Sequence, residues 1–190
     1  MSRPLFHSEF IISAWPSARM TSSDIQGSVT MKIAIASDHA GFPLKEEVRD
    51  YVRKLGHEIQ DLGAYNTNPS DYADFAALVG KALISDTAER GILICGSGVG
   101  VCIAANKMPG VRAGMCHDTY SAHQGVEHDE MNVLVMGARI IGTALAFECV
   151  ESYLNAKFIA TEERFVRRLN KVKAIEKQYM PAAAATTLTT

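Results

Sequence analysis

The stretch Gly91-Ile92-Leu93-Ile94-Cys95-Gly96-Ser97-Gly98-Val99-Gly100 determines how the rest of this chain is interpreted. Its first half, up to Cys95, is a continuous apolar run, typical of a strand that is buried on both faces of a sheet. The glycines of its second half let the backbone turn sharply, and we expect a helix to follow as far as Met108. A buried strand that passes through a tight turn into a helix is typical of the parallel sheets of α/β proteins.

The same alternation of short apolar strands and amphipathic helices continues on both sides of this stretch. The remaining strands are expected at 32–37, 57–62, 111–115 and 132–136, and the remaining helices at 42–55, 72–85, after residue 115, at about 142–154 and at 161–178. This alternation predicts a parallel, doubly wound sheet. In such a sheet the ligand crevice lies beyond the carboxyl ends of the strands, so the residues that follow each strand are the candidates for function.

Length and composition are those of one compact domain. The chain has 190 residues, of which 47% are hydrophobic and 21% charged, and its net charge of −2 provides no positive field for nucleic acid. No apolar run is long enough to cross a membrane, and the four cysteines include no CxxC pair, so we expect reduced thiols in a cytoplasmic protein.

The periodic pattern covers residues 31–178, which leaves an N-terminal extension of residues 1–30 and a loose C-terminal tail of residues 179–190. The extension is expected to be flexible, with docking on the domain or a neighbouring subunit, or a targeting role, as alternatives.

Two polar side chains follow the first strand, where Asp38 and His39 stand directly before a helix. Asp38 has two interpretations, a cap for the helix N-terminus or a carboxylate in the crevice. His39 has little packing to do at this edge, and its imidazole could donate a hydrogen bond to a phosphate or relay a proton.

The glycine turn after Cys95 matches neither of the common nucleotide-binding motifs. Its third glycine comes one residue too early for the dinucleotide fingerprint, and no Gly-Lys-Ser/Thr follows as in a P-loop. Its N–H groups could instead approach an anion or a developing oxyanion. Cys95 is then either a thiolate favoured by the helix amides or a small apolar residue of a buried strand. Cys102, Cys116 and Cys149 are interpreted as apolar packing residues.

Three histidines follow the fourth strand, His117, His123 and His128, but their spacing matches no standard zinc motif, so no metal is predicted. Asp118 or Thr119 is expected to cap the helix that follows. His128, at or just past the end of that helix, is expected to face the crevice.

Arginines supply positive charge at two places. Arg139 follows the fifth strand, whereas Arg164 and Arg168 lie four residues apart on one face of the last helix, with Arg167 beside them. Such a run is either a solvated helix face or a phosphate site, because guanidinium groups bind phosphate through paired hydrogen bonds.

Several of these motifs occur together in one order. They are Ser37-Asp38-His39-Ala40-Gly41, Cys95 to Gly100, Ile103-Ala-Ala-Asn-Lys107, His128-Asp129, and Asn132 through Gly137-Ala138-Arg139. In this combination, from Met31 to about Gln178, the chain resembles the type B ribose-5-phosphate isomerases and the related galactose-6-phosphate isomerases. The resemblance implies a Rossmann-like three-layer α/β/α sandwich with a five-stranded parallel sheet. It also implies a homodimer or tetramer with active sites shared between subunits, and no metal or organic cofactor.

The resemblance further implies a role for each motif. It matches Cys95 to the catalytic base that moves a proton between C1 and C2, and His128 to the residue that helps to open the furanose ring. Asp38 matches a substrate-binding position that could share in ring opening. The other substrate-binding positions that it implies are His39, Tyr72, Gly96, Ser97, Gly98, Val99, Gly100, Asp129, Arg139, Arg164 and Arg168. Of these, the glycine loop would hold the enediolate oxygens and the arginines the phosphate, some of them across the dimer interface.

Two departures from the family pattern lie beside the sugar. Asp129 stands where the family commonly has Asn, and Gly125-Val126-Glu127 replaces a stretch that usually contains Arg. An ionised Asp only accepts hydrogen bonds, so the sugar hydroxyl that it meets must donate. The two changes therefore bear on which sugar is bound.

We expect an isomerase of the pentose phosphate pathway that interconverts D-ribose 5-phosphate and D-ribulose 5-phosphate through a cis-enediolate. A hexose 6-phosphate, such as that of allose or galactose, and a tetrose phosphate are the alternative substrates. A non-catalytic phosphosugar- or nucleotide-binding module would explain the glycine loop and the arginines but would leave Cys95 and His128 without a task. A dehydrogenase is disfavoured by the missing dinucleotide fingerprint.

Overall fold

The computed structural model describes residues 30–180, so the expectations for residues 1–29 and 181–190 lie outside the described residues. The strands are β1 (Lys32–Ser37), β2 (Glu58–Asp61), β3 (Arg90–Cys95), β4 (Ala113–Met115) and β5 (Val133–Gly137). The helices are α1 (Phe42–Lys54), α2 (Tyr72–Ile84), α3 (Val99–Ala105), α4 (Thr119–Asp129), α5 (Thr143–Asn155) and α6 (Glu163–Tyr179).

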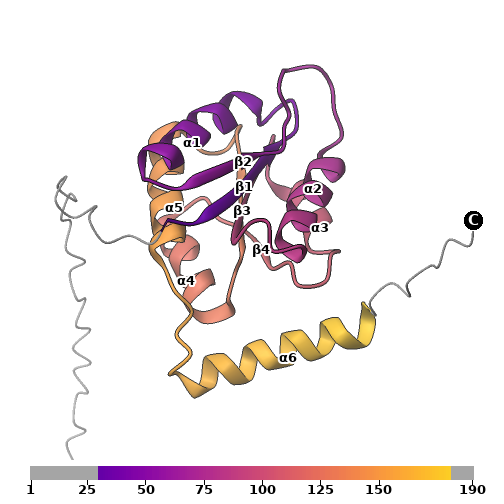
Figure 1. The fold of residues 1–190 in the computed structure, drawn as a ribbon, viewed down its shortest axis with the longest axis vertical. Coiled ribbons are helices and arrows are strands. Elements are labelled where there is room, and N and C mark those ends of the chain that lie inside the picture. The colour runs from indigo at the N-terminus through magenta and orange to yellow at the C-terminus, as the bar shows by residue number, and fades with distance from the viewer. Residues whose placement is uncertain (1–29, 181–190) are drawn as a thin grey trace, which may run out of the picture.

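The five strands form one parallel sheet in the order β2-β1-β3-β5-β4. Helices α1, α4 and α5 cover one face of the sheet, and α2 and α3 cover the other (Figure 1). The expected Rossmann-like α/β/α sandwich with a five-stranded parallel sheet is therefore confirmed. The strand order reverses between β1 and β3, so the crevice of such a sheet lies at the carboxyl ends of these two strands.

The alternation of side chains along β1 explains the two helix layers. Ile33 and Ile35 pack with residues of α1, α4 and α5, whereas Ala34 and Ala36 pack with residues of α2 and α3. All four side chains are completely buried. A strand that is apolar on both faces thus places a helix layer on each side of the sheet, as the continuous apolar runs predict.

The edge strand β4 is shorter than the expected 111–115, and α3 ends at Ala105, before the expected Met108. The side chain of Asn106, the C-cap of α3, contacts the first residue of β4. Its Oδ1 accepts the N–H of Ala113 at 2.9 Å, and its Nδ2 donates to the O of Ala113 at 2.8 Å. Asn106 therefore pairs with the free edge of β4 as a neighbouring strand would, which covers part of that edge.

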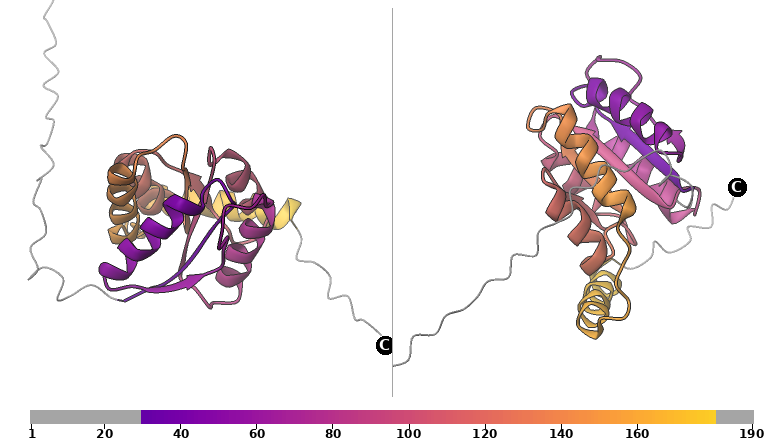
Figure 2. Two further views of the ribbon diagram at one scale, coloured as in Figure 1. Left: turned by 90° about the horizontal axis from the view of Figure 1, so that it is seen from above. Right: turned by 90° about the vertical axis from the view of Figure 1, so that its left-hand side faces the viewer.

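Helix α6 does not cover the sheet. In Figure 1 and in the right-hand view of Figure 2 it lies beyond α4, apart from the other helices. Phe165 and Leu169 of α6 are buried, whereas Val172, Ile175 and Tyr179 are exposed. Among the described helices none is long and apolar enough to span a membrane. All four cysteines fall in the described range and are free thiols.

Candidate active site

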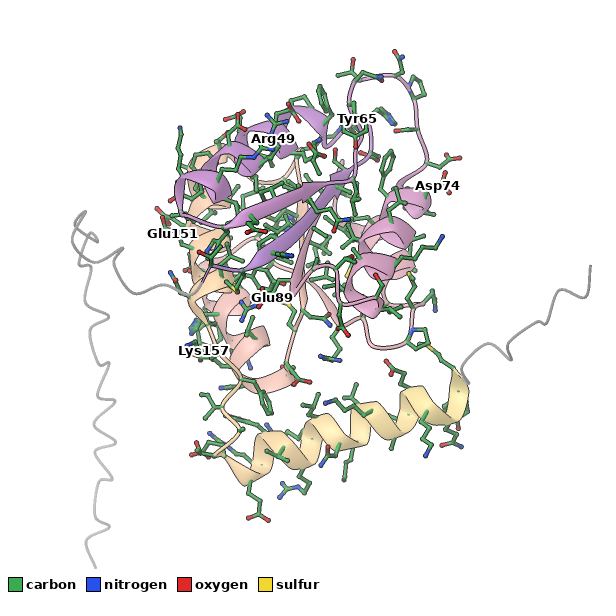
Figure 3. The ribbon with its side chains drawn as sticks, viewed as in Figure 1. Arg49, Tyr65, Asp74, Glu89, Glu151 and Lys157 are labelled. Carbon is green, nitrogen blue, oxygen red and sulfur yellow. The ribbon has the colours of Figure 1, made fainter. Side chains whose placement is uncertain are left out.

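The ends of β1 and β3 lie side by side at the carboxyl edge of the sheet. Ser37 pairs with Ile94, and the N–H of Asp38 donates to the O of Ile94 at 3.3 Å. Asp38 and Cys95, which directly follow this pair of residues, are therefore neighbours at the point where the strand order reverses. Figure 3 marks the two ends of the sheet, with Tyr65 after β2 at the carboxyl end and Glu89 before β3 at the amino end.

Asp38 holds the turn that leads from β1 into α1. Its Oδ1 accepts the N–H groups of Ala40 and Gly41, both at 2.9 Å, and the residue is 7% exposed. The N-cap of α1 is Gly41, so the carboxylate closes the turn before the helix and is not its cap. A Cβ at Gly41 would lie 2.4 Å from the O of Ile94, so this close approach of the turn to β3 requires glycine.

Two more predicted residues lie at this edge, His39 in the turn between β1 and α1 and Tyr72 at the start of α2. The N–H of His39 donates to Oγ of Ser70 at 3.0 Å, and the N–H of Ser70 donates to Nδ1 of the His39 ring at 3.1 Å. The same Nδ1 lies 3.3 Å from the O of Ser70. Tyr72 lays its ring over Gly100, where a Cβ would lie 2.8 Å from Cζ of the tyrosine. His39 and Tyr72 are thus held against the same turn and loop as Asp38 and Cys95.

Cys95 ends β3 with its sulfur beside the glycine loop. The N–H of Gly98 donates to Sγ of Cys95 at 3.1 Å, and the cysteine is 4% exposed. A hydrogen bond donated to sulfur stabilises negative charge on it, which a catalytic thiolate needs. Gly98 has a φ of +85°, a left-handed conformation that glycine adopts without strain. Ser97 and Val99, on either side of Gly98, are exposed.

Burial keeps the other three thiols protonated. It raises the pKa of Cys116 to about 12 and the pKa of Cys149 to about 11, and it also raises the pKa of Cys102. These three cysteines are packed as the sequence analysis expects, and Cys95 is the cysteine at the crevice.

The end of β5 supports the other side of the glycine loop. The N–H of Ala138 donates to the O of Cys95 at 2.8 Å, and the N–H of Arg139 donates to the O of Gly96 at 3.0 Å. The side chain of Arg139 is exposed, and a Cβ at Gly96 would lie 3.6 Å from Cζ of Arg139. The guanidinium group of Arg139 can therefore bind an anion beside the loop.

His128 does not face this crevice in its own chain, so that expectation is wrong for a single subunit. Helix α4 begins at the carboxyl edge, after β4, and runs back so that it ends at the amino ends of the strands. Two residues after His128, the O of Glu130 accepts a hydrogen bond from Nε of Arg112 at 2.7 Å, just before β4 begins. The His128 ring stacks on Phe165 of α6, with centroids 3.9 Å apart, and its Nδ1 lies 2.6 Å from Nε2 of Gln124.

Three further predicted residues, Asp129, Arg164 and Arg168, lie with His128 and not with Cys95. Asp129 lines a largely apolar groove of about 490 Å³ between the β4–α4 region and α6. Arg164 and Arg168 are exposed on α6, where the Arg164 guanidinium lies 4.6 Å from the centroid of the Phe165 ring. One chain therefore carries two groups of predicted site residues at opposite ends of its sheet.

His117 belongs to the crevice edge, although its sequence pattern suggested only a metal ligand. Its Nε2 accepts the N–H of Gly137, the last residue of β5, at 2.8 Å. Its place two residues after the end of β4 is the signal that could have identified it. Within residues 30–180 no group of three or more His, Cys, Asp or Glu residues is arranged to hold a metal ion. Ser70, which holds His39, carried no comparable signal because it lies within a long loop.

The arrangement at the carboxyl edge combines three chemical functions. The sulfur of Cys95 can take a proton from carbon, the N–H groups of the glycine loop can stabilise the oxyanion that results, and Arg139 can bind a charged part of the substrate. These are the requirements for moving a proton between neighbouring carbons of a small anionic sugar.

Comparison with known proteins agrees with this chemistry. The family model described as ribose/galactose isomerase matches residues 33–172. Ribose-5-phosphate isomerase B of Escherichia coli is 39% identical over 147 residues, which are 77% of this chain and 97% of the relative. D-erythrulose-4-phosphate isomerase of Pectobacterium atrosepticum is 39% identical over 132 residues, 67% of this chain and 85% of the relative. The solved structure of Clostridium thermocellum ribose-5-phosphate isomerase B is 43% identical, with a TM-score of 0.76 over 78% of this chain and 99% of that one. The chain therefore belongs to the ribose/galactose isomerase family and is a sugar-phosphate isomerase.

Proposed function

We propose that this isomerase interconverts D-ribose 5-phosphate and D-ribulose 5-phosphate. The observation that carries the proposal is the sulfur of Cys95, which lies where β1 and β3 end and accepts the N–H of Gly98 at 3.1 Å. The relative from Escherichia coli and the solved structure from Clostridium thermocellum both bear the name of this activity.

The reaction begins with ring opening, because the aldose is a closed furanose in which C1 is not yet a carbonyl. One group must take the proton of the C1 hydroxyl while another gives a proton to the ring oxygen. We assign these two tasks to Asp38 and to His128 of a second subunit.

Cys95 then carries the proton between the two carbons. Its thiolate takes the proton from C2, the electron pair of that bond forms the C1–C2 double bond, and negative charge develops on O1 of a cis-enediolate. The N–H groups of the loop Gly96–Gly100 stabilise this charge. The thiol returns the proton to C1 while the proton on O2 passes to O1, which leaves the ketone at C2. Arg139, with Arg164 and Arg168, binds the phosphate and holds the chain of the sugar in place.

We propose further that the active unit is a homodimer, or a tetramer built from such dimers, in which Cys95 and His128 of one site come from different chains. Two observations support this. Cys95 and His128 lie at opposite ends of the sheet of one chain. Helix α6 extends away from the domain with Arg164 and Arg168, and its apolar side chains Val172 and Ile175 are exposed where they line the groove. A second copy of the chain would bury these apolar side chains.

A tetrose phosphate is the second candidate substrate. The relative from Pectobacterium atrosepticum is named for D-erythrulose 4-phosphate, at the same 39% identity as the ribose-5-phosphate isomerase from Escherichia coli. Asp129, which stands where the type B ribose-5-phosphate isomerases commonly have Asn, changes the hydrogen bonds offered to the sugar.

The substrate is tested by a coupled assay of pentose, hexose and tetrose phosphates in the presence of EDTA. We expect the highest kcat/KM with ribose 5-phosphate. A higher kcat/KM with a tetrose or hexose phosphate would contradict the pentose assignment. Tight binding of NADH or ATP without turnover of any sugar phosphate would favour a binding module.

The base is tested by Cys95→Ser, with Cys102→Ser in the neighbouring helix as the matched control. We expect Cys95→Ser to lower kcat by roughly two to four orders of magnitude while folding and substrate binding are retained, because the base acts in the transition state. Cys102→Ser should keep normal turnover. Full activity of Cys95→Ser would remove the proposed base.

A further inference from the structure

His117 lies at the crevice edge, and the proposed mechanism gives it no role. It is half-buried, and its Nε2 lies 2.8 Å from the backbone N of Gly137. A backbone N–H can only donate, so Nε2 must accept, and the neutral ring carries its proton on Nδ1. In the other tautomer and in the imidazolium form, an N–H at Nε2 would face the N–H of Gly137.

This hydrogen bond takes the place of a backbone hydrogen bond between β4 and β5. Strand β4 ends at Met115, and the N–H of Cys116 still donates to the O of Val135 at 3.0 Å. The next N–H of β5 on that side belongs to Gly137, but the chain after Cys116 has turned away toward α4. The ring of His117 therefore supplies the acceptor that a strand carbonyl would otherwise supply.

Gly137 is in turn the residue against which the glycine loop rests. A Cβ at position 137 would lie 2.5 Å from both C and O of Ser97. The two residues after Gly137 donate to the carbonyls of Cys95 and Gly96 at 2.8 and 3.0 Å. A shift of Gly137 would therefore move the sulfur and the loop amides relative to each other.

We propose that His117 is a positioning residue of the isomerase, an inference that rests on the proposed function. Its uncharged Nε2 holds Gly137 in the place that sets the geometry between Cys95 and the oxyanion-binding amides. His117 itself contacts no reacting atom. Loss of this hydrogen bond should lower the reaction rate strongly, because a displacement of about 1 Å at a reacting centre can cost roughly 100-fold in rate.

Two substitutions of His117 separate positioning from stability. In His117→Gln the side-chain oxygen can accept the Gly137 N–H in place of Nε2, whereas His117→Ala leaves that N–H without the acceptor. We expect kcat of His117→Ala to fall roughly 100-fold with little change in KM, because the sulfur of Cys95 and the loop amides that would be displaced act on the transition state. His117→Gln should retain most of the turnover.

His57 provides the matched control. Its Nδ1 accepts the N–H of Met31 at 3.3 Å, which is the same kind of bond at the amino ends of the strands. His57→Ala should lower the free energy of unfolding without lowering kcat. If His57→Ala lost as much kcat as His117→Ala, the effect would be one of stability and the proposal would be overturned.

Nuclear magnetic resonance gives a readout that needs no turnover. We expect the ring nitrogens of His117 to report a protonated Nδ1 and an unprotonated Nε2. We also expect His117→Ala to move the amide signals of Gly96–Gly100, and His117→Gln to leave them near their wild-type positions.

A ring protonated on Nε2, or loop amide signals that are unchanged in His117→Ala, would overturn the proposal. A wild-type chain that converts no sugar phosphate would refute the proposed function alone, because the amide signals would still decide whether His117 positions the loop.

Discussion

Lys45 is completely buried although its side chain carries a charge, and its surroundings explain why this is possible. Its Nζ lies 2.8 and 2.9 Å from the carboxylate oxygens of Asp61 and 3.1 Å from Oε1 of Glu46. The ring centroids of Phe42 and Tyr65 lie 5.5 and 5.3 Å from the same nitrogen. Opposite charge and aromatic faces together compensate for the loss of water around the ammonium group.

A series of backbone hydrogen bonds connects the Lys45–Asp61 pair to the crevice. Oδ1 of Asp61 also accepts the N–H of Gly63 at 3.0 Å. The N–H of Ser37 donates to the O of Gly63, and the N–H of Ala64 donates to the O of Ser37, each at 2.7 Å. Ser37 directly precedes Asp38. Arg49 of α1 and Tyr65 of this loop also contact Asp61, since Nη1 of Arg49 lies 3.5 Å from Oδ2 of Asp61 and the hydroxyl of Tyr65 donates to the O of Asp61 at 3.0 Å.

At the scale of the residue, Lys45→Met is expected to lower the free energy of unfolding by about 3 kcal/mol, because it leaves Asp61 without its main partner. The double variant Lys45→Met/Asp61→Leu removes both charges and should be more stable than the single variant. Urea unfolding monitored by circular dichroism measures both. A double variant less stable than Lys45→Met would show that Asp61 stabilises the fold independently of Lys45.

Helix α6 is joined to the rest of the domain by few polar contacts. Nζ of Lys173 lies 2.9 Å from Oε2 of Glu130, and Oε2 of Glu176 accepts the N–H of Gly110 at 2.9 Å. This attachment leaves the arginines of the first half of the helix exposed. An exposed pair of guanidinium groups four residues apart on a projecting helix suits the proposed binding of phosphate in a neighbouring subunit.

At the scale of the element, we expect Arg168→Ala to raise KM for phosphorylated sugars by roughly tenfold or more, the effect of losing a charge-assisted hydrogen bond. KM for the corresponding free sugar should change little. Arg167, next to it in sequence but on the face of α6 away from Phe165, provides the control variant Arg167→Ala. Steady-state kinetics on both sugars measure the difference. Equal changes in KM for the two sugars would refute a role in phosphate binding.

The whole molecule presents two incomplete groups of site residues. Cys95, the glycine loop and Arg139 lie at the carboxyl edge of the sheet, and His128 lies at the other end, stacked on Phe165. Helix α4 separates them, and its 11 residues span about 16 Å at 1.5 Å per residue. In the proposed dimer the two groups of one site therefore come from different chains.

At the scale of the assembly, chains carrying Cys95→Ser and chains carrying His128→Asn should each be inactive alone and active after mixing. A mixed dimer has one site with both intact residues, so unfolding and refolding an equal mixture should restore roughly a quarter of wild-type turnover. Refolding each variant separately is the control. A mixture that stays inactive while mixed dimers form would contradict a site shared in this way.

The parts of this protein that sequence alone could predict are those that depend on neighbouring residues. The apolar runs ending at Ser37 and Cys95, and the glycines that follow Cys95, predict two buried strands of a parallel sheet, and β1 and β3 are those strands. That these two strands are neighbours where the strand order reverses is known only from the structure. Periodicity and glycine content are local properties, because they follow from the backbone geometry of a few consecutive residues. For the same reason Asp118 could be predicted as a helix cap, and its carboxylate accepts the N–H of Ser121.

Only the tertiary structure decided which of the remaining residues meet. His128 was expected in the crevice, but the direction of α4 takes it to the far end of the sheet. The bond from Gly137 to His117, and the pairing of Asn106 with β4, join residues that no sequence period connects. Such contacts depend on how elements that are distant in the sequence are placed relative to one another. The sequence therefore specified the strands, the turn and the sulfur at its start, and packing between distant elements determined what surrounds them.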